Sequence, residues 1–204
     1  MKVLLINGSP KSNGNTYLAL SEAALALEAC GVRTQIVSIG AKAVQGCIAC
    51  NKCRELGRCV FQDDLYNTVR EKLEDADGLI IGTPVFFAGP NGSFCALLDR
   101  VFYSCADRLA YKPGASVAVC RRGGSTAAFD RLNKYFTITN MPLVSSQYWN
   151  GVHGLLPGEA SQDAEGLQIM RTLGRNMAWM LKNLKNGGEA IPESEDRQRT
   201  NFIR

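Results

Sequence analysis

The chain has 204 residues, of which 46% are hydrophobic and 21% are charged, and its formal net charge is +4. This length predicts one globular domain, and a mild charge without a basic tract argues against a nucleic-acid-binding protein. The sequence contains no run of eighteen or more apolar residues, so no membrane-spanning helix is expected.

Short apolar strands alternate with segments of helical pattern along the chain. Strands are predicted at residues 2–7, 33–38, 78–85, 115–120 and 142–146. Helices are predicted at residues 16–29, 64–75, 94–106, 126–135 and 167–184. This alternation, with nearly continuous apolar strands, is typical of a parallel sheet that is covered by helices on both faces.

Five such strands predict a doubly wound, flavodoxin-like α/β fold with the strand order 2-1-3-4-5, which binds ligands at the carboxyl ends of its strands. We expect a single domain over residues 1–186 with a cysteine-rich insert at residues 46–60. Residues 187–204 are polar and charged, and we expect this tail to be disordered or to lie across a partner subunit.

The apolar run at the N-terminus leads into a glycine-rich turn and has no cleavage site, so we interpret it as a strand and not as a signal peptide. We therefore expect a cytoplasmic protein. In that reducing compartment the eight cysteines are not expected to form four disulfides, and clustered cysteines more often bind metal or take part in redox chemistry.

The loop after the first strand, residues 8–16, reads GSPKSNGNT and opens a helix. Its hydroxyls, amides and glycines, together with the charge of Lys11, suit a phosphate bound at the helix N-terminus. The loop matches neither the P-loop pattern nor GxGxxG. The alternative is a simple helix cap made by Asn15 or Thr16.

The loop after the third strand, residues 83–92, reads TPVFFAGPNG. It places Phe86 and Phe87 next to each other among prolines and glycines. These aromatic side chains can form one side of a binding site for a planar ring of a ligand. The alternative is that they simply cover the end of the sheet.

The loop after the fourth strand, residues 120–126, reads CRRGGST. Its paired glycines allow a close approach of the backbone to a ligand, and its two arginines can meet anionic groups. The alternative is a solvated turn that ends in a helix cap at Ser125 or Thr126.

Four cysteines lie within thirteen residues in the spacing C-x2-C-x2-C-x5-C, at Cys47, Cys50, Cys53 and Cys59. Thiolates at this compact spacing can surround one cuboidal iron–sulfur cluster. The nearest precedent is the ferredoxin run C-x2-C-x2-C-x3-C, whose last cysteine serves a second cluster. Structural zinc usually takes two well-separated C-x2-C pairs, so it fits less well. Free or redox-active thiols are the remaining alternative.

Three motifs resemble the NADPH-dependent FMN reductase family, and in particular its iron–sulfur flavoprotein branch: GSPKSNGNT, GTPVFFAGPNGSFCALLDR, and VCRRGGSTAAFDRLNKYF followed by SSQYWNGVHG. The resemblance extends over residues 1–166 and implies a flavodoxin-like fold that binds FMN. It also implies a [4Fe-4S] cluster at the four cysteines. By position in the motifs, the FMN-binding residues are expected to be Ser9, Lys11, Asn13, Asn15 and Thr16 at the phosphate, Pro84, Val85, Phe86, Phe87 and Ala88 at the isoalloxazine ring, and Arg122, Gly123 and Gly124 on its other side.

We therefore expect an FMN-dependent oxidoreductase that passes electrons between FMN and a [4Fe-4S] cluster. Because the flavin carries the chemistry, no catalytic acid or base is assigned, and His153, the only histidine, is interpreted as structural. The alternatives are a cluster-free NAD(P)H-dependent reductase of flavins, quinones or nitro compounds, and a flavin-binding carrier without turnover.

The partner expected for this oxidoreductase is NAD(P)H or a protein electron carrier such as ferredoxin. Neither nucleic acid nor a membrane is expected as a partner. The resemblance also implies a homodimer or a homotetramer.

Overall fold

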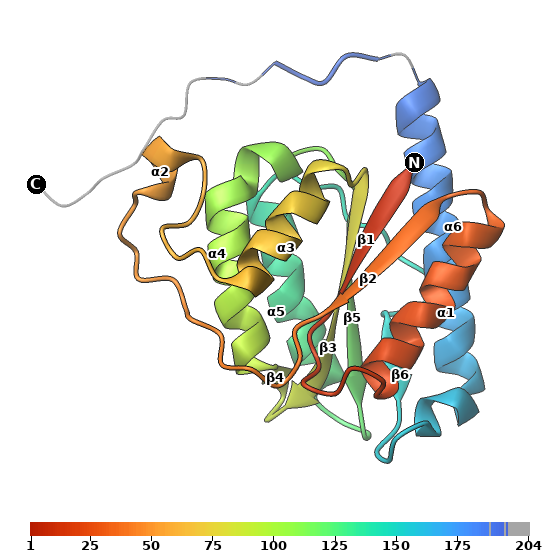
Figure 1. Cartoon of the computed structure of the whole chain (residues 1–204). Helices are drawn as coiled ribbons and strands as arrows, with labels where there is room; N and C mark the ends of the chain where they lie inside the picture. Colours follow the sequence, from red (N-terminus) through yellow and green to blue (C-terminus); the bar gives the residue numbers. More distant parts are fainter. Residues whose placement is uncertain (188, 194, 196–204) are drawn as a thin grey trace, which may run out of the picture.

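The computed structural model describes residues 1–187, 189–193 and 195 (Figure 1). Five strands are parallel: β1 (Lys2–Asn7), β2 (Arg33–Ser38), β3 (Gly78–Phe86), β5 (Gly114–Cys120) and β6 (Gly151–His153). A short β4 (Gly89–Pro90) pairs with the end of β3 in antiparallel direction. The helices are α1 (Asn15–Ala29), α2 (Cys53–Leu56), α3 (Asp64–Glu74), α4 (Gly92–Leu109), α5 (Ser125–Ile138) and α6 (Ala164–Asn186), with a 3₁₀ helix η1 at Glu159–Gln162.

The strands lie in the order β2-β1-β3-β5-β6. Because the hairpin strand β4 is inserted in the chain order, this differs slightly from the predicted order 2-1-3-4-5, but the five parallel strands keep the flavodoxin-like arrangement and the fold class is confirmed. The hairpin strand β4 was not predicted, and it lies outside this parallel path.

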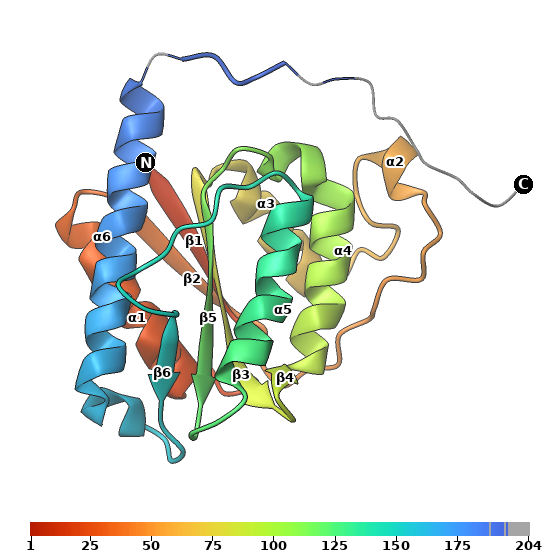
Figure 2. The ribbon, with the colours of Figure 1, turned by 180° about the vertical axis from the view of Figure 1, so that it is seen from behind.

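Alternate residues of the central strands face two separate apolar layers, as the pleat of a strand requires. Val3 and Leu5 of β1 pack in the layer under α1 and α6, whereas Leu4 and Ile6 pack in the layer under α3, α4 and α5. All four side chains are fully buried. Figures 1 and 2 show the two helical layers on opposite faces of the sheet.

The packing of α6 on α1 depends on Gly174. A β-carbon at this position would lie 2.5 Å from the carbonyl oxygen of Ala23 and 2.8 Å from the β-carbon of Ala26. Because a real β-carbon does not approach a backbone oxygen so closely, glycine lets the two helices lie in contact at this point.

The prediction of the fifth strand at residues 142–146 is wrong. Only Leu143 of this segment forms a bridge, with Gly114 at the start of β5. After this bridge, the side-chain amide of Asn150 donates to the carbonyl of Ser116 in β5 (3.1 Å). A side chain thus makes the bond to β5 that a backbone N–H of a neighbouring strand would otherwise make. The chain returns to β5 at Gly151–His153, which is the actual edge strand.

None of the helices in the described residues is long and apolar enough to cross a membrane. Helix α6 ends at Asn186, where the predicted domain also ends. Most of the tail predicted at residues 187–204 lies outside the described residues.

Candidate functional site

Three loops meet at the carboxyl edge of the sheet, after β1, β3 and β5 (Figure 1). These are the three loops that the sequence singled out. Parallel strands end at the same edge, so residues far apart in the chain come together there. A second candidate site, the cysteine segment around α2, lies at the opposite end of α4 (Figures 1 and 2).

The loop after β1 is fixed in place by hydrogen bonds of Asn7, the last residue of β1, which is fully buried. Its side-chain oxygen accepts from the backbone N–H of Ser9 (3.1 Å), and its amide nitrogen donates to the hydroxyl of Ser38 (3.0 Å). The hydroxyl of Ser9 in turn accepts from the backbone N–H of Lys11 (3.1 Å). These side-chain bonds order the loop beyond the last sheet bond, which the N–H of Gly8 donates to the carbonyl of Gly82 (2.7 Å).

Helix α1 begins without a side-chain cap, because its N-cap residue is Gly14. The N–H groups of its first turn therefore remain available to an anion, and the helix dipole favours one. Thr16 is buried at this helix end, whereas Lys11 and Asn13 are exposed on the loop. The capping alternative for Asn15 or Thr16 is thus not realised.

The side chain of Asn15 has a different partner from the expected phosphate. Its amide nitrogen donates to the carbonyl of Leu156 (2.9 Å), and its oxygen accepts from the N–H of Gly158 (3.0 Å) and of Ala160 (3.3 Å). Asn15 therefore fastens the loop before α6 onto the start of α1, and it can meet an anion there through its backbone N–H.

The loop after β3 forms a tight hairpin with β4. Val85 pairs with Pro90 and Phe86 with Gly89, so Phe87 and Ala88 make the turn. Both have positive φ (49° and 57°), which is unusual for residues other than glycine. The side chain of Phe87 is fully exposed and that of Phe86 is about half exposed. Strained backbone combined with exposed aromatic rings is typical of a binding site.

The loop after β5 packs against this hairpin through Gly124, whose φ is +82°. A β-carbon at Gly124 would lie 2.8 Å from the Cα of Ala88. Gly123 has no atom within 4 Å of such a position, and Arg121 and Arg122 are exposed. The second and third loops are therefore in direct contact, as expected for two walls of one site.

Asn91 connects the first loop, the second loop and the start of α4, and the sequence analysis did not identify it. Its amide nitrogen donates to the carbonyl of Gly8 in the first loop (2.8 Å), and its oxygen caps α4 at the N–H of Ser93 (3.1 Å). Its own N–H donates to the hydroxyl of Thr83 (3.0 Å). A buried asparagine before a helix was a detectable cap signal, but its partner Gly8 is 83 residues away.

The four cysteines of the segment line one pocket beside the second half of α4, together with residues of that helix such as Tyr103. Ala49 and Asn51 have positive φ (53° and 59°), which folds the segment tightly between the cysteines. Partial burial raises the pKa of Cys53, and the other three thiols raise it further. In the part of the chain that the structure describes, no set of three or more His, Cys, Asp or Glu side chains is arranged as a metal site.

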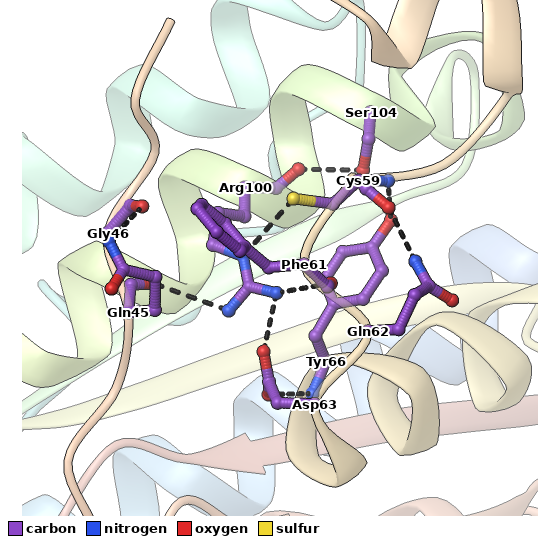
Figure 3. A network of polar contacts seen from close by, with 9 residues as sticks. All are labelled: Gln45, Gly46, Cys59, Phe61, Gln62, Asp63, Tyr66, Arg100 and Ser104. Atoms are coloured by element: carbon purple, nitrogen blue, oxygen red, sulfur yellow. Dashed lines mark hydrogen bonds and ion pairs between the residues drawn. The ribbon is translucent and has the colours of Figure 1, made fainter. Parts of the chain in front are cut away.

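Cys59 is the member of this segment that is fixed most firmly to the fold (Figure 3). Its N–H donates to the hydroxyl of Tyr66 (2.9 Å), and its sulfur accepts from Nε of Arg100 (3.4 Å). Burial alone would lower the pKa of Arg100, but its hydrogen bonds to Cys59 and Asp63 raise the pKa on balance. Arg100 therefore places a buried cation directly at this sulfur.

The two sites are separated along α4. The loop after β3 enters the helix at Gly92, whereas the cysteine pocket is lined by Arg100, Tyr103 and Ser104 of the same helix. Eight to twelve residues of helix correspond to about 12–18 Å along its axis.

A third hollow lies at the edge strand β6, between the starts of α5 and α6. It is lined by Tyr148, Trp149, His153 and Asp163 among others. Asp163 caps α6 at the N–H of Gly166 and also accepts from the N–H of His153 (2.9 and 2.6 Å). The ring of His153 lies 3.3 Å from the same carboxylate, which supports the structural role expected for this histidine.

Comparison with known proteins identifies the family. The sequence profile of NADPH-dependent FMN reductases matches residues 1–154. An iron–sulfur flavoprotein of Methanocaldococcus jannaschii is 35% identical over 193 residues, which cover 91% of this chain and 100% of that protein. The chain belongs to the NADPH-dependent FMN reductase family. Its similarity to the iron–sulfur flavoproteins places it in that branch of the family, so both parts of the resemblance are confirmed.

Two solved structures share the fold of this family member. RosB with bound 8-demethyl-8-formylriboflavin-5'-phosphate superposes with a TM-score of 0.69 at 15% identity, covering 100% of this chain and 94% of RosB. A flavodoxin from the domain Archaea superposes with a TM-score of 0.60 at 15% identity, covering 89% and 99%. At these identities the likeness concerns the fold. With the family assignment, the chain is an FMN-dependent oxidoreductase.

Proposed function

We propose that this FMN reductase family member passes electrons between FMN, held at the carboxyl edge of the sheet, and a [4Fe-4S] cluster held by Cys47, Cys50, Cys53 and Cys59. The observation that carries the proposal is that all four cysteines line one pocket in a fold whose strand-end loops suit FMN. Bound FMN supplies one- or two-electron chemistry and a bound cluster supplies one-electron chemistry.

The residues at the sheet edge fit FMN. The uncapped first turn of α1, the Ser9 hydroxyl and the exposed Lys11 suit the phosphate. The exposed rings at the β3–β4 hairpin suit the isoalloxazine ring, with the backbone at Pro84, Val85 and Ala88 beside it. Gly123, Gly124 and Arg122 border the same space from the loop after β5, while Thr16 and the backbone N–H of Asn15 lie at the phosphate end. Asn13 is exposed on the first loop, and a phosphate contact from it stays a prediction.

The cysteine pocket fits an iron–sulfur cluster by the chemistry of its donors. Four thiols are the ligand set of such a cluster. Two of the cysteine sulfurs accept hydrogen bonds from the protein. The N–H of Ala49 donates to the sulfur of Cys47 (3.4 Å), and Nε of Arg100 donates to the sulfur of Cys59 (3.4 Å). The curated relative of M. jannaschii bears the name iron–sulfur flavoprotein, which supports the same donor assignment.

The electron partner and the assembly are further parts of the proposal. We expect NAD(P)H or a protein carrier such as ferredoxin to exchange electrons with the protein in the cytoplasm. A homodimer or homotetramer is expected, and the exposed Tyr148 and Trp149 beside the edge strand are candidates for contact with a second subunit.

An anaerobic reductive titration tests the proposed pairing of cofactors. If both are present, about three electrons per chain are needed for full reduction, because FMN takes two and the cluster takes one. The end of the titration should also show an electron paramagnetic resonance signal from a reduced cluster. An end point of about two electrons without this signal would favour the alternative, a cluster-free NAD(P)H-dependent reductase of flavins, quinones or nitro compounds.

A further inference from the structure

Arg100 is a buried arginine at the centre of the polar network in Figure 3. It lies on α4, and its side chain is fully buried. A buried guanidinium is tolerated only when its N–H groups have partners, since removing the charge from water is costly. The partners of Arg100 therefore show what the fold uses it for.

Every group to which Arg100 donates a hydrogen bond lies in the cysteine segment or directly beside one of its ends. Nη1 donates to the carbonyl of Gln45 (3.2 Å), just before the first cysteine. Nη2 donates to the carbonyl of Phe61 (2.7 Å) and pairs with Asp63 (2.5 Å), just after the last cysteine. Nε donates to the sulfur of Cys59 (3.4 Å). One side chain thus joins both ends of the segment to α4.

A second chain of hydrogen bonds fixes the backbone of Cys59 to the same helix. The N–H of Cys59 donates to the hydroxyl of Tyr66 (2.9 Å), which lies 2.7 Å from the hydroxyl of Ser104. Ser104 donates to the carbonyl of Arg100 (2.7 Å). The guanidinium also stacks over the ring of Tyr66, 4.7 Å from its centre. Both the amide and the sulfur of Cys59 are therefore positioned by α4.

Cys59 differs in this respect from the other cysteines of the pocket. Cys47 and Cys50 are exposed. The sulfur of Cys53 lies 4.0 Å from the carbonyl of Tyr103, a longer contact than that between Cys59 and Arg100. The fold therefore presets the fourth cysteine, while the first two lie on the exposed part of the segment.

We propose that Arg100, acting on the cluster proposed above, is a positioning residue that presets Cys59 as a ligand and raises the reduction potential of the cluster. Hydrogen bonds to ligand sulfurs and nearby charges are the main protein controls on such potentials. An uptake of one electron makes the cluster more negative, and a buried cation stabilises that state. Asp63 offsets this charge only in part, because its side chain is 43% exposed and is screened by water.

The positioning role is tested on iron-free protein. Amide hydrogen exchange over residues 46–63 is compared between the wild type and Arg100→Gln. We expect exchange roughly tenfold faster in the variant, because both ends of the segment lose their attachment to α4. Unchanged exchange in a folded variant would overturn the positioning role, and this result does not depend on whether iron binds.

The tuning role is tested by a potentiometric titration of the reconstituted protein, followed by electron paramagnetic resonance. In Arg100→Gln the ratio of reduced to oxidised cluster at a fixed potential should fall about tenfold, which is 59 mV for a one-electron couple. The FMN potential serves as an internal reference and should not change. As a control, Arg131→Gln removes an arginine of α5 that pairs with Asp99, and it should leave both potentials unchanged.

Arg100→Lys keeps the tuning role testable if Arg100→Gln does not fold. Lysine retains the charge but cannot reproduce the planar fork of donors, so we expect a smaller fall in the cluster potential. A wild-type cluster potential in both Arg100→Gln and Arg100→Lys would overturn the tuning role. If Arg100→Gln does not fold, a wild-type potential in Arg100→Lys would overturn it. Wild-type protein that takes up no iron on reconstitution would instead overturn the proposed function, and the tuning role with it.

Discussion

Replacing Cys50 with serine is expected to remove the bound iron and leave one FMN bound to each chain. A [4Fe-4S] cluster needs its thiolate ligands, and serine supplies a much poorer one. Cys50 is exposed on the wall of the cysteine pocket, so the fold should tolerate the change to within about 0.5 kcal/mol. The FMN loops lie at the other end of α4 and should not be affected. Iron and flavin are measured on the same purified sample.

Cys30→Ser is the matched control for this experiment. Cys30 caps the end of α1 and is not among the residues that line the cysteine pocket. It should therefore keep the iron content of the wild type. Iron retained at the wild-type level in Cys50→Ser would contradict the ligand assignment, and a joint loss of iron and FMN would contradict the separation of the two sites.

Replacing Gly124 with alanine is expected to lower the stability of the protein by about 3 kcal/mol and to weaken FMN binding at least about tenfold. Part of the cost is the left-handed backbone at φ +82°, which disfavours a β-carbon by about 1–2 kcal/mol. The rest is overlap with the Cα of Ala88, only 2.8 Å away, at a typical cost of about 1–3 kcal/mol. The strain is relieved if the hairpin and the loop after β5 move apart. That movement opens the site.

Gly123→Ala is the control for stability, because it lies in the same loop with open space around the added β-carbon and without a left-handed φ. It should leave the stability of the protein nearly unchanged. Titration of the apoprotein with FMN, followed by quenching of flavin fluorescence, gives the affinity, and thermal unfolding gives the stability. A wild-type affinity for FMN in Gly124→Ala would show that contact between the second and third loops does not shape the site.

The positions of the first four parallel strands followed from the sequence because the signals for a strand are local. Apolar runs such as residues 2–7 and 78–85 are strands wherever they pack, and the helical periods between them allow only parallel connections. The prediction of the fifth strand was wrong because it rested on a local signal that was misleading here. Residues 142–146 are apolar enough for a strand, whereas the actual edge strand is only three residues long and is preceded by the side-chain contact of Asn150.

The candidate site was predictable in outline for the same reason. Loops that follow parallel strands converge, so glycine-rich segments after β1 and β5 and the aromatic segment after β3 could be assigned to one site. The strain of the hairpin could not be predicted, since Phe87 and Ala88 are not residues that normally take a positive φ.

The contacts that complete both sites were not predictable, because each joins residues far apart in the chain. Asn15 bonds to the loop 141 residues later, and Arg100 reaches a cysteine 41 residues earlier. In the sequence, an arginine in the middle of an amphipathic helix looks like a surface residue. Only the packing of the cysteine segment against α4 shows that it is buried.

The most direct test of the account is the content of iron, acid-labile sulfide and FMN per chain in protein purified without oxygen. We expect about four irons, about four sulfides and about one FMN per chain, with a visible spectrum that shows both chromophores. FMN without iron or sulfide, even after anaerobic reconstitution, would contradict it, and the protein would then be a cluster-free flavin reductase.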